Sequence, residues 1–353
     1  MPILLISLLL AALPSLAYAK VVSNEMFLDH VRRAQVRVAV DPSTLDLRNG
    51  PQGPGTYPLG AEVGCKYEEK DSLHPLGGHS PKFPCVTPDG RRLKVKYKGE
   101  ANPEVYGEVV GARLLWALGF YADSMSSVKI MCENCPADPW TATASSPRNK
   151  RAFEPATVQE RLKGAEIERA AGEAWTFGDL DLVNPELGGA SRADTDALKL
   201  LAAFMNHGDN TANQQRLVCL EGDPECKSPA MYITDVGGVF GGKGYFTSYK
   251  HWTRRPKLWK DSARCVLDFS GTDNKYKDPV ISEGGRKLLA DLLGKLSESQ
   301  VKDLFLGARF DHLARREPPF IGANGKSRPL TVDDWVKAFI ERRSQITGVR
   351  CPQ

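Results

Sequence analysis

The chain has 353 residues, of which 41% are hydrophobic and 25% are charged, and it carries a formal net charge of +4. These are the proportions of an ordinary globular protein, and the length suits one two-lobed domain or two smaller ones. The small positive charge favours no polyanionic partner, so we expect no nucleic-acid binding.

The first 19 residues are apolar and carry no charged side chain. They end in Ala17-Tyr18-Ala19, the small-x-small pattern of a signal-peptidase site. We therefore expect residues 1–19 to be a signal peptide and the protein to be secreted or periplasmic. The lack of Lys or Arg before the apolar core leaves an uncleaved anchor as the alternative, but the run is short for a membrane span. No other stretch is apolar enough, so we expect no stable membrane span after cleavage.

Residues 20–60 are expected to form an N-terminal extension and linker. A helix is predicted over Asn24 to Val36, and a segment rich in Gly and Pro follows over Asn49 to Gly60.

Residues 61–100 have the pattern of a small β-rich region. The run from Gly77 to Phe83 is a glycine-containing turn, which can place backbone N–H groups over phosphates but is more often a plain turn. Further along, apolar residues alternate with Lys94, Lys96 and Lys98, which predicts a strand with one apolar face. Its lysines form either an exposed basic face or a face of which one lysine turns into a cleft.

A helix is predicted from Pro103 to Gly119, because apolar residues recur there at helical spacing and glycine is a natural stop. Glu104 and Glu108 lie one turn apart on its first turns. They either face solvent or pair with a nearby cation. A strand is then expected over Val128 to Met131, followed by an exposed loop over residues 141–152.

Residues 196–242 carry the strongest chemical pattern in the chain. A helix over residues 195–206 ends in His207-Gly208-Asp209, and strands are expected over residues 216–220 and 231–234, the second leading into Asp235. Antiparallel pairing of these strands would bring Asp209 and Asp235 to the same end. One carboxylate can then accept a proton from a substrate hydroxyl while the other holds a divalent metal, and Asn213 or Gln214 can add an amide oxygen.

Four further helices are expected, near residues 158–172, 284–295, 298–306 and 331–343. The segment 243–280 mixes basic and aromatic residues. Such a mixture is either a solvated surface with a few packed rings or a surface that binds phosphates or single-stranded nucleic acid.

The eight cysteines are an even number in a chain that we expect to be exported, which indicates disulfides. Cys219 and Cys226 flank the connection between the two predicted strands and are the first expected pair. Cys132 and Cys135 form a local disulfide, a redox pair or half of a zinc site, and the absence of a second CxxC or paired His disfavours zinc. The remaining pairings considered are Cys65 with Cys85 and Cys265 with Cys351.

The pattern His207-x-Asp209, a downstream amide and Asp235-x-Gly237 resembles the catalytic and metal-binding loops of the protein-kinase-like superfamily. The likeness is greatest to its divergent branches: HipA-type, phosphoinositide and secretory-pathway kinases, and similar uncharacterised secreted bacterial proteins. The order of glycine turn, lysine strand, glutamate helix and acidic loops extends the resemblance over residues 60–245. It implies an α+β, two-lobed fold, with a small β-rich N-lobe containing one helix (61–140) and a larger, mainly helical C-lobe (141–353).

The resemblance also implies roles for particular residues. Lys96, with Lys94 as the alternative, would position the phosphates of ATP or another nucleoside triphosphate, and Glu108, with Glu104 as the alternative, would hold that lysine. Asp209 would orient the acceptor hydroxyl, and His207 would support its loop. Segment 132–140 would be the hinge between lobes, and segment 243–280 the activation or substrate loop. The phosphate-covering residues would be Gly77, Gly78, Ser80 and Lys82, and the ligands of Mg²⁺ or Mn²⁺ would be Asp235 with Gln214 or Asn213.

The chain departs from the family pattern at three points. The amide that usually lies five residues after the catalytic Asp is Gln214 here, with Asn213 four residues after; Val236 replaces the usual Phe; and the glycine turn is not of the GxGxxG form. The expected function is phosphoryl transfer to a hydroxyl acceptor, either a protein or a small molecule. The alternatives are a pseudokinase that binds nucleotide or protein, an AMP transferase, and a thiol–disulfide or metal module at Cys132 and Cys135.

Overall fold

The computed structural model describes residues 20–69, 78, 80–99, 101–169, 174–242, 247–254, 257–269, 276–321 and 327–352. The predicted signal peptide, Gly77 and parts of segment 243–280 lie outside these residues. Across the described ranges, no helix combines the length and apolarity that crossing a bilayer requires.

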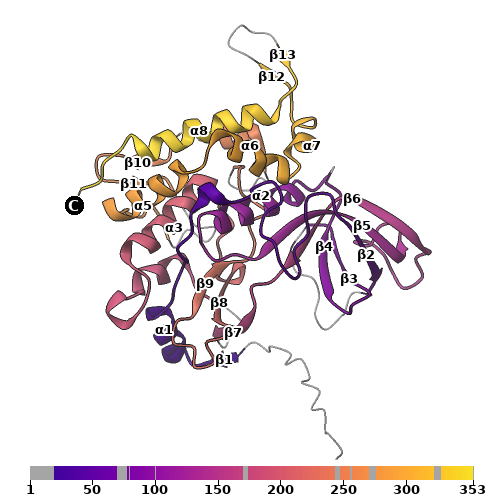
Figure 1. Cartoon of the computed structure of the whole chain (residues 1–353), viewed down its shortest axis with the longest axis horizontal. Coiled ribbons are helices and arrows are strands. Elements are labelled where there is room, and N and C mark those ends of the chain that lie inside the picture. Colours follow the sequence, from indigo (N-terminus) through magenta and orange to yellow (C-terminus); the bar gives the residue numbers. More distant parts are fainter. Residues whose placement is uncertain are drawn as a thin grey trace, which may run out of the picture.

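The N-terminal region is built around a closed β-barrel, shown on the right of Figure 1. The strand order is β2-β3-β4-β6-β5, with β2 and β5 parallel and the other neighbours antiparallel. Buried and exposed residues alternate along β2, as expected for a strand with one face inside a barrel. The strands are β2 (Glu62–Tyr67), β3 (Lys82–Val86), β4 (Arg92–Lys96), β5 (Ser124–Pro136) and β6 (Arg148–Glu160).

A second sheet of four strands, in the order β1-β7-β8-β9, lies below the helical region in Figure 1. The antiparallel pairing of β8 with β9 is the hairpin predicted from the sequence. The strands of this sheet are β1 (Lys20–Val22), β7 (Gly164–Arg169), β8 (Gln215–Leu220) and β9 (Ala230–Ile233). Two small hairpins complete the strands: β10 (Trp259–Asp261) with β11 (Val266–Leu267), and β12 (Phe320–Ile321) with β13 (Ser327–Arg328).

The C-terminal region is mainly helical, so the chain is an α+β protein with a β-rich N-terminal part, as predicted. Its two longest helices begin at capping boxes: Ser191 and Asp194 form one on α3, and Thr331 and Asp334 form one on α8. The helices are α1 (Asn24–Arg32), α2 (Glu104–Ala117), α3 (Arg192–Met205), α4 (Tyr249–Thr253), α5 (Glu283–Gly294), α6 (Glu298–Gly307), α7 (Phe310–Ala314) and α8 (Val332–Thr347). Short 3-10 helices are η1 (Pro42–Thr44), η2 (Phe177–Leu182), η3 (Pro185–Leu187) and η4 (Ala212–Gln214).

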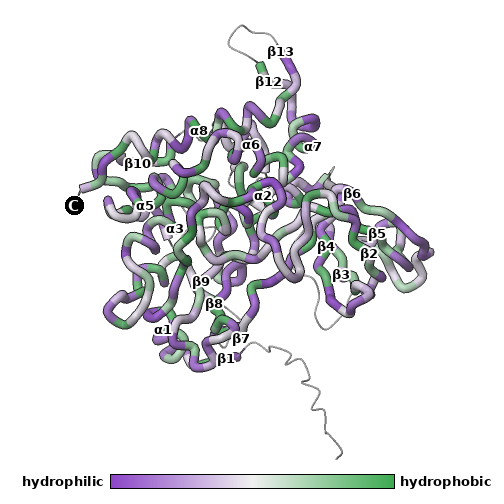
Figure 2. The backbone as a smooth tube through the Cα atoms, viewed as in Figure 1, coloured by the Kyte–Doolittle hydropathy of each residue, from purple (hydrophilic) through white to green (hydrophobic). Residues whose placement is uncertain are grey.

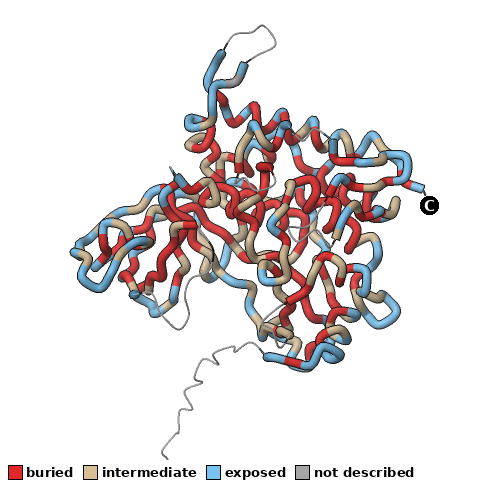
Figure 3. Tube along the Cα trace, turned by 180° about the vertical axis from the view of Figure 1, so that it is seen from behind, coloured by how far each residue is buried: buried red, intermediate tan, exposed pale blue. Residues whose placement is uncertain are grey.

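Helix α2 is the element that joins the two regions. It is buried on nearly all sides, and Glu108 and Arg113 are buried along with its hydrophobic residues. Figure 3 shows buried residues concentrated where α2 and the barrel strands meet the helical region. Figure 2 shows hydrophobic and hydrophilic residues alternating along the barrel strands, whose inner side chains form a separate core. A buried helix of this kind fixes its polar side chains in place, because they cannot reorient into solvent.

Most predicted elements are confirmed, including the lysine strand, the glutamate helix and the helices that became α1, α3, α5, α6 and α8. The predicted helix over 158–172 is wrong: β6 runs to Glu160, and β7 follows from Gly164. Gly164 has a φ of +150° and lies against the carbonyl oxygen of Cys219, a close approach that only glycine permits. The strand predicted over Val128–Met131 is part of the much longer β5.

Residues 20–60, expected as an N-terminal extension and linker, also contribute to the folded core. Phe27, Val31 and Leu47 are buried in the large core of the helical region, and β1 pairs in parallel with β7. The buried guanidinium of Arg113 on α2 also donates to the carbonyl oxygens of Leu47 and Arg48. The expected lobe boundary at residues 140–141 falls between β5 and β6, two strands of one barrel.

All eight cysteines are placed at disulfide distance in the pairings considered from the sequence. Cys132 and Cys135 adopt the first of their three alternatives, a local disulfide. The four bonds are Cys65–Cys85, Cys132–Cys135, Cys219–Cys226 and Cys265–Cys351.

Candidate active site

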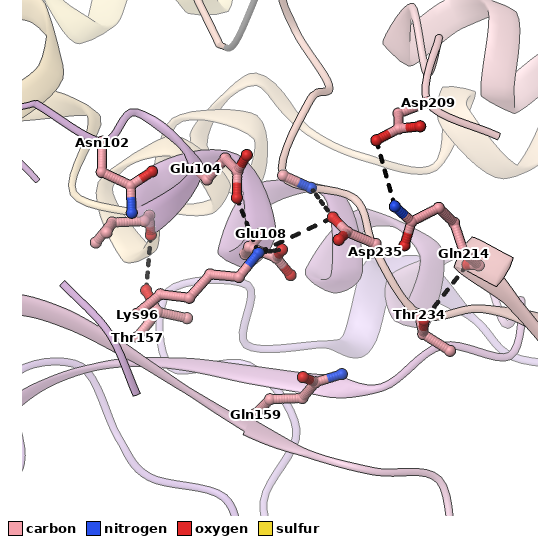
Figure 4. A network of polar contacts seen from close by, with 12 residues as sticks. Lys96, Asn102, Glu104, Glu108, Thr157, Gln159, Asp209, Gln214, Thr234 and Asp235 are labelled. Carbon is pink, nitrogen blue, oxygen red and sulfur yellow. Dashed lines mark hydrogen bonds and ion pairs between the residues drawn. The ribbon is translucent and has the colours of Figure 1, made fainter. Parts of the chain in front are cut away.

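The centre of the candidate site is the ammonium group of Lys96, at the end of β4. Lys96 is 3% exposed, and its Nζ atom donates to Glu104 Oε2 at 2.9 Å and to Glu108 Oε1. Asp235 Oδ1 lies 4.0 Å from the same nitrogen. Figure 4 shows these side chains converging from a strand, a helix and the segment after β9. The two glutamates that the sequence left as alternatives both bind the lysine.

The charges of this group depend on one another. Burial opposes a charged Lys96, but the carboxylates of Glu108, Asp235 and Glu104 outweigh it and raise the pKa of the ammonium. Burial raises the pKa of Glu108 to about 8, despite the attraction of Lys96. For Asp235, burial is outweighed by Lys96 and by the Gly237 N–H, so its pKa falls to about 2. Asp235 is therefore the ionised carboxylate at neutral pH.

The loop after β9 is fixed against α2 by two close approaches. The Gly237 N–H donates to Asp235 Oδ1 at 3.2 Å, which orients the carboxylate. A Cβ atom on Gly107 would collide with the carbonyl oxygen of Gly237, and one on Gly111 would lie 2.9 Å from Val236 Cβ. The two glycines are one helical turn apart, so they let α2 lie directly on the loop that carries Asp235.

Asp209 lies on the other side of Asp235 and forms a pair with Gln214 (Figure 4). The amide nitrogen of Gln214 is 3.4 Å from Asp209 Oδ2. The backbone places this pair: α3 ends at Asn206 in the left-handed conformation, and Thr234 N–H donates to the Gln214 carbonyl at 3.0 Å. Desolvation by the surrounding protein and the neighbouring Asp235 raise the pKa of Asp209, which suits a group that accepts a proton.

The two amides considered as metal ligands point in different directions. Gln214 contacts Asp209, whereas the exposed Asn213 contacts the Thr211 hydroxyl with its amide oxygen. Of the two candidate ligands, Gln214 is therefore the one whose side chain lies at Asp209 and Asp235.

His207 is fully buried between these elements. Neither ring nitrogen has a hydrogen-bond partner among the described residues, and burial lowers its pKa to about 4. The imidazole is therefore neutral at physiological pH, and it lies at a tilt beside the ring of Phe177, with centroids 6.5 Å apart. Its position under the turn is that of a structural residue rather than a proton donor to solvent.

The glycine turn leads into β3, whose first residue, Lys82, lies next to Lys96. Lys82 is the register partner of Lys96 across β3 and β4, and it is 6% exposed. A Cβ atom on Gly78 would lie 3.2 Å from Lys82 Nζ, so the ammonium reaches the turn, and Ser80 is buried nearby. Burial, with repulsion from Lys96, lowers the pKa of Lys82. Two lysines thus lie opposite each other on neighbouring strands, close enough for their charges to repel.

The connection between the barrel and the helical region is not where the sequence placed it. β5 turns back into β6 through residues 137–147, so segment 132–140 belongs to a long hairpin, and the chain crosses over at residues 161–163. Asp123 holds this crossing: it is 2% exposed, accepts the Leu162 N–H at 2.9 Å and accepts from the Gln159 amide. Sequence reasoning missed Asp123, because nothing near it in the sequence marks it as functional.

The segment expected as an activation or substrate loop is partly packed. Trp252 is 1% exposed on α4, and the Trp259 indole N–H donates to the Gln345 carbonyl at 2.8 Å. Lys250, Lys257 and Lys260 are exposed. The described part of this segment is therefore a solvated basic surface anchored by buried rings, the plainer of the two interpretations.

No family model matches the chain, and no curated protein matches its sequence. Among solved structures, the chain is similar to the proinflammatory kinase CtkA of Helicobacter pylori. That match has a TM-score of 0.43 and 8% sequence identity, and it covers 80% of this chain and 94% of that chain.

Proposed function

We propose that this chain is an exported, kinase-like phosphotransferase that moves a phosphoryl group from ATP or another nucleoside triphosphate to a hydroxyl acceptor. The observation that carries the proposal is the position of Lys96. Its ammonium is held by Glu104 and Glu108 and lies 4.0 Å from Asp235, a carboxylate on a separate loop. A fixed cation beside an ionised carboxylate is the pairing that phosphoryl transfer requires, since phosphates bind the first and a divalent metal binds the second.

Lys96 and Lys82 would bind the phosphates in this proposal. The two glutamates orient the Lys96 ammonium and keep it charged, and Lys82 adds a second ammonium on the neighbouring strand. Lys82 has no ion pair among the described residues. Its lowered pKa indicates a charge that is costly to bury without an anion, and a phosphate would provide one.

Asp235 and Gln214 would hold Mg²⁺ or Mn²⁺. The donor set fits a hard cation, because Asp235 is ionised at neutral pH and Gln214 brings an amide to the same end of the β8–β9 hairpin. Glu108 Oε2 is also buried without a hydrogen-bond partner among the described residues, which leaves one more oxygen acceptor unused beside Asp235. The ion would neutralise charge on the phosphates.

Asp209 would orient the acceptor hydroxyl and accept its proton. It is the exposed member of the acidic pair, and its raised pKa improves it as a base. His207, neutral and buried, supports the turn from below.

The test is thermal unfolding of the oxidised chain beginning at Lys20, with ATP and Mg²⁺ or Mn²⁺, beside Asp235→Ala and Asp209→Ala. A ligand at about 100 times its Kd stabilises the folded state by roughly 2.7 kcal/mol. We expect a metal-dependent rise in Tm in the wild type, its loss in Asp235→Ala and its retention in Asp209→Ala. Phosphorylation of a hydroxyl acceptor should be lost in both variants.

Three outcomes would change the assignment. If the Asp209→Ala variant kept full turnover, Asp209 would not be the base. A nucleotide-dependent Tm shift without any transfer would indicate a binding module of the pseudokinase kind. Release of pyrophosphate with labelling of the acceptor by AMP would indicate nucleotidyl transfer in the same cleft.

A further inference from the structure

Two disulfides meet inside the barrel, away from the candidate active site. Cys65 lies on β2, Cys85 on β3, and Cys132 and Cys135 lie at the end of β5. All four are at most 3% exposed. Their bonds are Cys65–Cys85, which links two neighbouring strands, and Cys132–Cys135, which closes a short turn.

The sulfur atoms of the two bonds are in contact. The Sγ atoms of Cys85 and Cys132 are 3.9 Å apart, and those of Cys65, Cys85 and Cys132 all lie within 4.8 Å of one another. A thiolate attacks a disulfide directly on one of its sulfur atoms, so a free thiol at Cys132 would have a disulfide within reach.

The backbone selects which new bond can form. Cys65 and Cys132 are register partners on the parallel strands β2 and β5. Neighbouring strands are about 4.8 Å apart, and a disulfide needs Cα atoms roughly 4.4–6.8 Å apart, so this pair can be bridged without moving the strands. Cys85 and Cys132 lie on strands separated by β2, which places their Cα atoms farther apart.

A surface cavity gives access to these bonds. Its volume is about 690 Å³, and Cys65 and Cys132 are among the residues that line it, together with Gly64 and Met131. A Cβ atom on Gly64 would meet nothing within 4 Å, so the wall beside Cys65 is open. The cavity is large enough for a small dithiol.

We propose that Cys65, Cys85, Cys132 and Cys135 form a single thiol–disulfide exchange site that an external dithiol opens. The dithiol reduces Cys132–Cys135 and leaves as its own disulfide. The Cys132 thiolate then attacks Cys65 Sγ, the Cys65–Cys132 bond forms, and the Cys65–Cys85 bond breaks. The electron pair leaves on Cys85, which takes up a proton. The covalent link thereby moves from β2–β3 to β2–β5 and releases β3, the strand that carries Lys82.

The test uses Cys135→Ser in the full oxidised chain, which leaves Cys132 without its partner. The protein is incubated at about pH 8, where thiols are partly ionised, then quenched in acid, alkylated while denatured and mapped by mass spectrometry. We expect a linked Cys65–Cys132 peptide and label on Cys85. The matched control is Cys226→Ser, because Cys219 belongs to no such sulfur group among the described residues, and its label should stay on Cys219.

Label confined to Cys132, with Cys65–Cys85 intact, would overturn the proposal, and a Cys85–Cys132 peptide would overturn the choice of Cys65. Limited reduction of the wild type with dithiothreitol covers the case in which the variant does not fold. In this wild-type experiment, the first reduced species should contain the Cys65–Cys132 bond together with free Cys85 and Cys135. Free Cys132 and Cys135 beside an unchanged Cys65–Cys85 bond would contradict the exchange. None of these outcomes depends on nucleotide binding.

Discussion

At the scale of single residues, the buried ion group around Lys96 is the feature on which both stability and the proposed function depend. We predict that Lys96→Met destabilises the fold by about 3–5 kcal/mol, because breaking a buried pair leaves carboxylates without their counter-charge. Denaturant unfolding measures this change. Lys98→Met is the matched control on the same chain segment: Lys98 pairs with Asp138 at the surface, and its loss should cost under about 1 kcal/mol. Equal losses of stability in the two variants would show that Lys96 stabilises the fold no more than a surface lysine does.

Asp123 gives a prediction about pH. Burial raises its folded-state pKa to about 6 from 3.8, so the folded state binds the proton more tightly than the unfolded state. Stability from this group is therefore present at low pH and is lost as pH rises from about 4 to 6. Asp123→Asn removes the buried charge and should recover stability on the order of 3 kcal/mol above pH 6, with little gain at pH 4.

The measurement is denaturant unfolding of both proteins across that pH range, and the difference between them isolates Asp123 from other titrating groups. A difference that does not change with pH would show that the carboxyl is not perturbed. A loss of stability at every pH would show that the hydrogen bonds to Leu162 and Gln159 need a carboxylate.

At the scale of elements, the contact of α2 with the Asp235 loop depends on two glycines. We predict that Gly107→Ala destabilises the protein by about 1–3 kcal/mol and weakens nucleotide binding, because the new methyl group would push the Gly237 backbone away. Gly294→Ala on α5 is the control: its Cβ would meet nothing within 4 Å, so it should stabilise by up to about 1 kcal/mol through helix propensity. Thermal unfolding with and without ATP and Mg²⁺ separates the two effects. Unchanged binding in Gly107→Ala would show that the loop does not need this contact.

The elements that the sequence predicted well are those whose pattern is local. The alternation around Lys96, the helical spacing before His207 and the β8–β9 hairpin each lie within one continuous stretch of the chain, so period and turn signals suffice. The helix predicted over 158–172 is wrong because the local pattern did not distinguish helix from strand there. The apolar residues fit both a helical and a strand period, and the pairing of β7 with β8, which no local pattern shows, makes the segment a strand.

The candidate site was predictable to a similar degree. Lys96, Glu108, Asp209 and Asp235 carry a motif order that the resemblance supplied, and the structure brings them into one group. That both Glu104 and Glu108 bind Lys96 depends on the angle between α2 and β4, which spacing alone does not determine. Asp123 acts through a connection whose place in the fold was predicted wrongly, so its role could not be read in advance.

At the scale of the whole molecule, the Cys265–Cys351 bond ties the end of the chain to the helical region. It spans 86 residues, and the Cys351 N–H also donates to Glu283 on α5. Cys219–Cys226 spans only 7. A disulfide stabilises by limiting the unfolded chain, and the effect grows with the closed loop, to about 4–5 kcal/mol for the longer bond against roughly 2–3 for the shorter.

We therefore predict that the double variant Cys265→Ser with Cys351→Ser loses more stability than Cys219→Ser with Cys226→Ser, by about 2 kcal/mol. Guanidinium unfolding of both variants and the wild type gives the two differences. The m-value should rise more in the longer-loop variant, because its unfolded state exposes more surface once the bond is gone. Equal losses would mean that native contacts at the two bonds, rather than loop length, set their contribution. In that case, Glu283→Gln, which weakens the contact of α5 with Cys351, should destabilise the chain by a comparable amount.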